Sequence, residues 1–185
     1  MNKVLVVVFF LLLGGCTPMP PLNFSVPNVG VSPKKIDAEL RSMTVTLGRP
    51  DEAKGDLPMG IEATTAMWQT ALQEAIDRMA IFKDDAARKV NIQVKVLALN
   101  IPVFGASFTT KTIARYEIID RATGSIIYTQ EIAADGVVPA NHAFVGVVRA
   151  RESINRSVQN NISQFLQALG SVDVNKPMFP APTQQ

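Results

Sequence analysis

The chain has 185 residues, of which 47% are hydrophobic and 18% charged, a length and composition that suit one globular domain with a buried core. Its 18 Lys and Arg residues against 16 Asp and Glu give a formal net charge of +2. This near balance argues against the concentrated basic field that nucleic-acid binding requires, so we expect no nucleic-acid partner.

The first sixteen residues carry the most informative pattern. Lys3 precedes an apolar run over 4–13, and Gly14 and Gly15 follow this run directly before Cys16, the only cysteine of the chain. A positive start, an apolar run shorter than the roughly 20 residues of a membrane-spanning helix, and small residues before a cysteine indicate an export signal. Two alternatives stay open: an ordinary secretory signal with an incidental cysteine, and an uncleaved anchor helix.

The segment Leu13–Cys16 (Leu-Gly-Gly-Cys) resembles the bacterial lipobox. The resemblance implies that Cys16 carries a diacylglycerol and a palmitate, and that residues 1–15 are a signal peptide removed by cleavage between Gly15 and Cys16. Two or more acyl chains anchor a protein stably in a membrane. Thr17, rather than Asp, follows the cysteine, so the resemblance also implies sorting to the outer membrane, with the folded part in the periplasm.

Proline content divides the remaining 170 residues into three parts. Residues 16–35 predict a semi-extended, lipidated tether, because proline forbids helix and interrupts sheet. Residues 36–172 predict a single periplasmic domain, and the proline-rich residues 173–185 predict a disordered tail. With only one cysteine, no disulfide can form within the chain, so packing must stabilise the domain.

Hydrophobic periodicity predicts six elements in this domain. Alternation predicts strands over 42–47, 90–99, 107–119 and 125–134, and helical spacing predicts helices over 65–82 and 143–169, with Thr65 as an N-cap and Phe144 on an apolar face. The second strand is apolar on both faces at 97–99, which predicts a bulge or a cover on both sides there. We therefore expect an α+β fold: a two-layer sandwich of order β-α-β-β-β-α, with a mostly antiparallel four-stranded sheet and two helices on one face.

Residues that could carry catalytic chemistry are scarce. His142 is the only histidine, no cysteine is free, and no Gly-x-Ser-x-Gly motif occurs, so a hydrolytic triad lacks its parts. One histidine without a free thiol leaves only carboxylates for a metal, and Gly146 stands alone where a phosphate-binding loop would need several glycines. We therefore expect no catalytic residue, no metal and no cofactor, and a protein that is not an enzyme.

Two surface features are not explained by folding alone. The loop over 101–106 is apolar where an exposed turn would ordinarily be polar, so Val103 and Phe104 are candidate contacts with a partner or with lipid. The alternative is that this loop folds back over the sheet edge. The second feature is a charged cluster on the last helix that would suit an anionic partner, the alternative being a solvated helix surface: Arg149, Arg151, Glu152 and Arg156.

The lipobox, the tether, the hairpin over 114–128 and the closing helix together resemble small outer-membrane lipoproteins of largely unknown function, similar to the auxiliary lipoproteins of envelope transport systems. The resemblance rests on element order and length over about 35–169, and it carries over no site residue except Cys16. It implies a non-catalytic domain that binds an envelope protein, as an accessory or structural component of a transport, secretion or envelope-maintenance system. The oligomeric state stays open.

Two other functions also stay open. A lipid- or small-ligand-binding protein would use a cleft between the helices and the sheet. An envelope enzyme would have His142 as its only candidate base.

Lipid attachment at Cys16 can be tested directly. Cells fed a clickable fatty-acid analogue should label the protein, and Cys16→Ser should abolish the label because serine has no thiol to alkylate. In-gel fluorescence of the immunoprecipitated protein measures both. A Cys16→Ser protein that labels as strongly as the wild type would show that the lipobox is not used.

Overall fold

The structure, a computed structural model, describes residues 19–172. Its elements in chain order are β1 (Glu39–Leu47), α2 (Glu62–Met79), β2 (Lys89–Asn100), β3 (Phe108–Asp120), β4 (Ile126–Val138), the 3-10 helix η1 (Ala140–His142) and α3 (Gly146–Ser171). The expected order β-α-β-β-β-α is confirmed, with η1 added before α3. The predicted signal peptide, Cys16 and the predicted tail over 173–185 lie outside the described residues.

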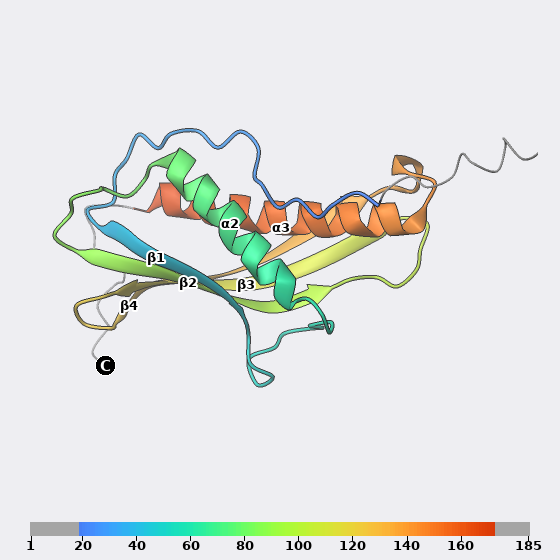
Figure 1. The fold of residues 1–185 in the computed structure, drawn as a ribbon, viewed down its shortest axis with the longest axis horizontal. Coiled ribbons are helices and arrows are strands. Elements are labelled where there is room, and N and C mark those ends of the chain that lie inside the picture. The colour runs from blue at the N-terminus through green and yellow to red at the C-terminus, as the bar shows by residue number, and fades with distance from the viewer. Residues whose placement is uncertain (1–18, 173–185) are drawn as a thin grey trace, which may run out of the picture.

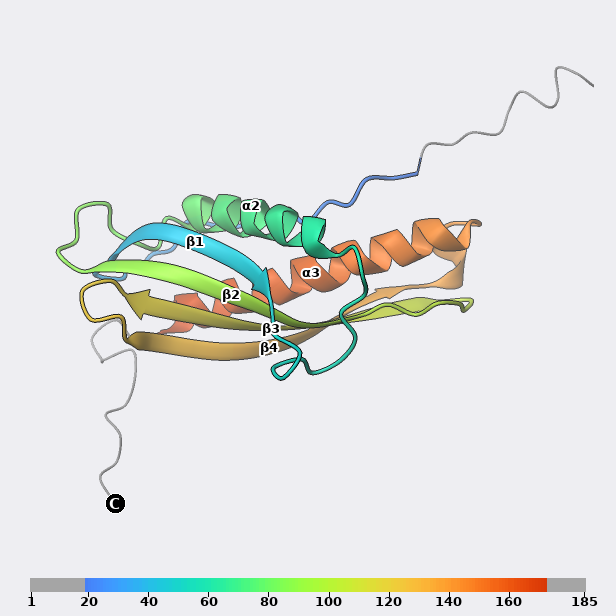
Figure 2. The same ribbon diagram turned by 60° about the horizontal axis from the view of Figure 1, so that its bottom comes forward.

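The four strands form one sheet in the order β1-β2-β3-β4. β1 pairs in parallel with β2 because α2 carries the chain back between them, and the other two pairings are antiparallel. Figures 1 and 2 show both helices on one face of the sheet, with α3 along β3 and β4 and α2 lying obliquely over β1. The two-layer α+β sandwich with a mostly antiparallel sheet is therefore confirmed.

Large apolar side chains fill the space between the helices and the sheet. Trp68 and Leu72 of α2, Tyr116 of β3 and Phe165 of α3 are all at most 2% exposed. The rings of Tyr116 and Phe165 stack with their centroids 4.1 Å apart. Burial raises the pKa of the Tyr116 phenol, which stays neutral and donates a hydrogen bond to Asn161 Oδ1 (2.8 Å).

The end of β2 departs from a regular strand. The register of β2 against β3 shifts between Val96 and Ala98, which is the bulge expected from the two-sided apolar stretch. The loop over 48–61 also covers this stretch, since the Leu99 N–H donates a hydrogen bond to the carbonyl of Asp56 (2.7 Å). A bulge and a cover therefore occur together, and the cover protects the edge of β2 that lies beyond β1.

α3 lies very close to β4 because the residues between them are small. Gly136 of β4 faces Ser153 and Ser157 of α3, and a Cβ at Gly136 would lie 2.0 Å from the Ser153 carbonyl oxygen and 2.3 Å from the Ser157 nitrogen. Thr110 Oγ1 and Ser153 Oγ share a hydrogen bond of 2.7 Å beside this contact. Helix and strand therefore meet backbone to backbone, at a separation that only glycine permits.

A buried asparagine satisfies polar groups farther along the same helix. The Asn161 side chain accepts the hydrogen bond from Tyr116, and its Nδ2 donates to the carbonyl of Ile132 (3.0 Å) and to Thr112 Oγ1 (3.2 Å). Because a buried amide without partners is costly, these bonds favour a single register of α3 against β3 and β4.

The proline-rich segment before β1 is part of the fold. We expected 16–35 to be a tether that lifts the domain off the membrane, but residues 19–35 lie extended along the helices, as the blue trace in Figure 1 shows. Phe24 is 2% exposed and meets Trp68 edge to face with ring centroids 6.5 Å apart, and Val26 is 4% exposed. Proline excludes a helix here but not packing, and the alternation of apolar and polar residues around Phe24 lets one side of the extended segment face the core.

Two local details also differ from the expectation. α2 begins at Glu62 with Ile61 at its N-cap, and Thr65 lies inside the first turn with its hydroxyl donating to the Glu62 carbonyl (2.7 Å). An acidic residue is favourable in the first turn of a helix, which suits the earlier start. Phe144 precedes α3 and is fully exposed rather than buried on the apolar face.

The contact at Gly136 generates a stability prediction. Gly136→Ala should lower the free energy of unfolding by about 3 kcal/mol, because the added methyl group meets backbone atoms of α3 that cannot turn aside. Gly30→Ala is the matched control: a Cβ there has no atom within 4 Å, so the change should be below about 0.5 kcal/mol. Urea denaturation followed by circular dichroism measures both. Equal midpoints for the two variants would contradict the close approach.

Candidate functional site

The partner contact predicted from the sequence lies at one end of the molecule. Val103 and Phe104, in the loop between β2 and β3, are 90% and 87% exposed. The alternative in which this loop folds back over the sheet edge is therefore wrong. Two large apolar side chains are instead presented to solvent at a loop tip, where they stabilise nothing within the described chain.

A second apolar segment lies beside this loop. Phe144, Val145 and Val147, where the chain enters α3, are 101%, 50% and 45% exposed. Figures 1 and 2 place both segments at the right-hand end of the molecule. A groove of about 400 Å³ lies between them and is lined by residues of both: Pro102, Val103, Phe104, Gly105, Phe108, Gly146, Val147 and Ala150. We call residues 101–105 and 144–147 together the apolar end.

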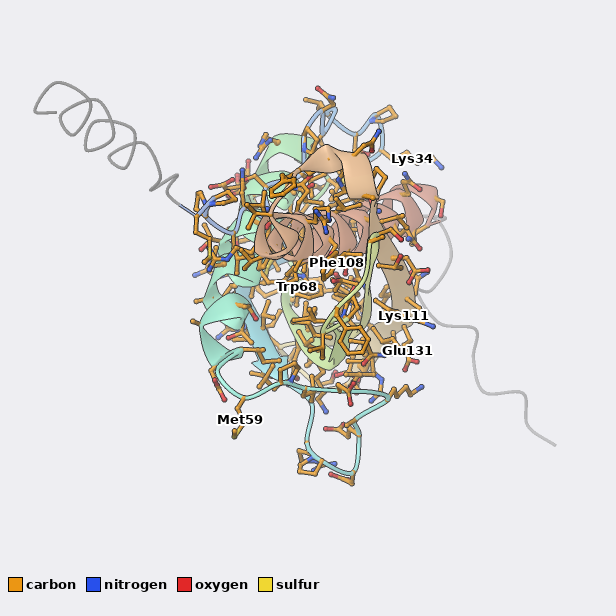
Figure 3. The ribbon with its side chains drawn as sticks, turned by 90° about the vertical axis from the view of Figure 1, so that its right-hand side faces the viewer. Lys34, Met59, Trp68, Phe108, Lys111 and Glu131 are labelled. Atoms are coloured by element: carbon orange, nitrogen blue, oxygen red, sulfur yellow. The ribbon has the colours of Figure 1, made fainter. Side chains whose placement is uncertain are left out.

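Arg149 connects the turn at the second segment of the apolar end to Phe108, just after the first segment. Its Nη1 donates hydrogen bonds to the carbonyls of Ala143 and Phe144, the second at 3.0 Å. Its guanidinium carbon lies 5.5 Å from the centre of the Phe108 ring, a cation–π contact with the buried first residue of β3. Figure 3 faces this end of the molecule and labels Phe108. One side chain thus connects the turn before α3 to the strand that follows the first loop.

The apolar end carries no formal charge. The segments 101–107 and 136–148 contain no Lys, Arg, Asp or Glu, and His142 is their only histidine. His142 itself is exposed in η1. Transfer of these two segments to an apolar environment would therefore desolvate no charged side chain of their own. The neighbouring Arg149 is partly buried and already bonded to two backbone carbonyls.

The first described residues lie at the same end of the molecule. Arg151 Nη1 donates to the carbonyl of Pro20 (2.7 Å), and Asn155 Oδ1 accepts from the N–H of Asn23 (2.9 Å). The segment before β1 therefore follows α3 from its first turns. Met19, where the description begins, is 52% exposed next to this part of the helix.

The predicted lipid-attachment residue Cys16 and the cleavage residue Gly15 lie outside the described residues. Three peptide links join Cys16 to Met19, and a chain extends by at most about 3.6 Å per residue, so their Cα atoms lie within about 11 Å of each other. Covalent reach alone therefore confines the predicted anchor to the neighbourhood of the apolar end.

The arginines of the last helix bind the chain itself. Arg156 donates to Glu152 Oε1 (2.7 Å) and to the carbonyl of Val137 (2.9 Å), and Arg151 holds Pro20 as described above. The cluster considered as a face for an anionic partner is thus engaged in fastening β4 and the N-terminal segment to α3. Its sequence pattern gave no sign of this, because the acceptors are backbone carbonyls far away in the chain.

The densest group of charges lies on the outer face of the sheet, opposite the helices. Glu52 accepts from Lys95 Nζ (2.8 Å) and lies 3.6 Å from Arg115, which in turn lies 3.5 Å from Glu131. The hydrogen bond from Lys95 is the main cause of a lowered pKa at Glu52. A carboxylate held in its ionised form by a cation is poorly suited to general acid–base catalysis near neutral pH.

Two broader properties hold for the part of the chain that the structure describes. Within residues 19–172, no group of three His, Cys, Asp or Glu side chains could hold a metal ion. In that same range, none of the helices combines the length and the apolar character that crossing a membrane requires.

The sequence predicted one segment of the apolar end, the loop with Val103 and Phe104, but not the segment that begins at Phe144. Phe144 lies four residues before Val148, a spacing typical of one helical face, and was therefore assigned to the core. The backbone at Ala143 and Val145 is extended, so the helix begins only at Gly146 and the periodicity does not apply to Phe144.

No family model and no curated protein matches the chain. Among solved structures, the chain is similar to a Xanthomonas campestris protein of the family model DUF330, with 7% identity and a TM-score of 0.49 over 80% of this chain and 93% of that one. It is also similar to a hypothetical protein from Chlamydia trachomatis (9% identity, TM-score 0.47, 72% and 96%) and to a minor lipoprotein from Acinetobacter baumannii (15% identity, TM-score 0.39, 75% and 94%).

Removal of Arg149 should release the turn before α3. The backbone N–H groups of residues 148 and 149 donate to the Val145 carbonyl at the end of this turn. In Arg149→Ala their hydrogen exchange should rise at least about tenfold, since loss of charge-assisted hydrogen bonds costs roughly 1.5–3 kcal/mol locally. Hydrogen–deuterium exchange with mass spectrometry measures the change. Arg156→Ala, on the same helix, should leave exchange at 148 and 149 as in the wild type. Unchanged exchange in Arg149→Ala would contradict the positioning role.

Proposed function

We propose that this protein is a non-catalytic lipoprotein, anchored through Cys16 in the outer membrane, that serves as an accessory or structural component of an envelope system. Its periplasmic domain would bind another component of the envelope through the apolar end. The proposal rests mainly on this surface. Its apolar side chains are exposed, its two segments contain no charged residue, and it lies near Pro20 at the start of the described residues.

The lipobox supports the anchored part of the proposal. A positive start, a short apolar run, two glycines and the only cysteine stand in the order that lipid attachment requires. Anchoring would also raise the effective concentration of the domain near other membrane components, so that a contact surface of modest area would suffice.

A ligand-binding function is less well supported. The cleft that such a protein would use, between the helices and the sheet, is filled by Trp68, Tyr116 and Phe165. A groove of about 300 Å³ does lie outside this core, between residues 26–30 and the C-terminal ends of both helices. It is open at the surface, and no charged side chain lines it to recognise a ligand.

An enzymatic function has the weakest support. His142 is exposed, and its neighbours along the chain, Asn141 and Ala143, supply neither acid nor base. A histidine base ordinarily needs a partner that orients its ring.

Photo-crosslinking in cells tests whether the apolar end contacts an envelope component. A photoreactive amino acid at Phe104 should give an adduct with lipid or protein at several times the yield of the same residue at Met59, which is equally apolar and 100% exposed. The Cys16→Ser variant should lose most of the adduct because its local concentration at the membrane falls. Equal yields at Phe104 and Met59 would argue against the apolar end as the contact.

A further inference from the structure

We propose that the apolar end inserts shallowly into the lipid bilayer that carries the anchor, which gives the domain a second membrane contact beside Cys16. This inference rests on the proposed lipid anchor and deepens it by naming the partner of the apolar end as a lipid surface.

Position is the first reason. The hydrogen bond between Arg151 and Pro20 sets the start of the described chain against the second turn of α3. Arg151 is four residues beyond Val147, about 6 Å along a helix axis. Cys16 lies within about 11 Å of Met19 by chain length. A membrane that holds the acyl chains of Cys16 must therefore come close to the apolar end.

Chemistry is the second reason. The most exposed large apolar side chains of the apolar end are Phe144, Val103 and Phe104, and the segments 101–107 and 136–148 lack Lys, Arg, Asp and Glu. A membrane interface accepts exposed apolar groups to a depth of about 5–10 Å, and the two segments carry no charged side chain of their own that would lose its hydration. The guanidinium of Arg149 beside them already donates to the carbonyls of Ala143 and Phe144. Insertion is shallow because the backbone groups of the loop must keep contact with water or headgroups.

Shape is the third reason. Val103 and Phe104 on one side, and Phe144 on the other, stand on two separate segments with a groove between them. A protein partner would need pockets matched to both segments, whereas lipid chains and headgroups adapt to any convex apolar surface. Arg149 links the turn before α3 to Phe108 at the start of β3, and residues of both segments line one groove, so both can enter the same interface.

Environment-sensitive probes on the lipidated full chain test the insertion. Because acylated Cys16 has no free thiol, a cysteine introduced by Val103→Cys or Phe144→Cys can be labelled with the fluorophore NBD at a single position. The controls are Met59→Cys and Thr123→Cys, the second in the β3–β4 turn at the opposite end of the molecule (Figure 1). Each labelled protein is reconstituted into vesicles of phosphatidylethanolamine and phosphatidylglycerol.

The expected result separates the two pairs of probes. NBD at positions 103 and 144 should brighten at least about threefold on vesicles and be quenched by lipids that carry a nitroxide in the acyl chain, as for groups at the headgroup–acyl boundary. NBD at positions 59 and 123 should do neither. Adding Phe104→Asp to Val103→Cys should remove most of the brightening, whereas Met59→Asp, the same change at an equally exposed residue, should not.

Three results would overturn the inference, and they can be told apart. Vesicle-bound protein whose probes at 103 and 144 behave like those at 59 and 123 refutes the insertion and leaves the anchor intact. If the probes at 103 and 144 do not brighten on vesicles and the photoreactive residue at 104 crosslinks to one protein in cells, the apolar end binds a protein instead of lipid. An adduct of twice the mass of the chain would identify that protein as a second copy. Protein that carries no lipid on Cys16 by mass spectrometry and does not bind vesicles refutes the proposed function, and the inference falls with it.

Discussion

The backbone-to-backbone contact between α3 and β4 at Gly136 sets the geometry of much of this molecule. A side chain at this position would push away a helix of 26 residues that lies along two strands. The N-terminal segment hydrogen-bonds to Asn155 and Gln159 of that helix, and the turn before it is held by Arg149. The course of the segment and the shape of the apolar end therefore both depend on how closely one helix packs on one strand.

Two kinds of interaction stabilise the packing of α3 against the sheet. Apolar side chains of α3, such as Phe165 and Leu169, supply the favourable burial, which depends on area and hardly on direction. Ser153, Ser157 and Asn161, at successive intervals of four residues, are also buried. Thr110 and Tyr116 bond to the first and last of them. Such directional bonds discriminate between registers that burial alone would leave nearly equal.

Features that depend on local pattern could be predicted from the sequence. Alternation identified β2 and β3, and composition singled out the apolar loop at Val103 and Phe104, although whether this loop is exposed or folded back was settled only by the structure. The packing of Phe24 could not be predicted in this way, because prolines correctly exclude a helix but say nothing about which surface an extended segment covers. The hydrogen bonds of Arg149 and Arg151 could not be predicted either, because both arginines donate to backbone carbonyls, which every residue possesses.

The course of the N-terminal segment along α3 has a mechanical consequence. Asn23 and Pro20 are hydrogen-bonded to α3, so only residues 17–19 remain to join the fold to a lipidated Cys16. The domain would therefore be held close to the membrane surface. α3, which follows the longest axis in Figure 1, rises about 39 Å over its 26 residues. The turn between β3 and β4, at the other end of the molecule, would then be held at a set height above the bilayer.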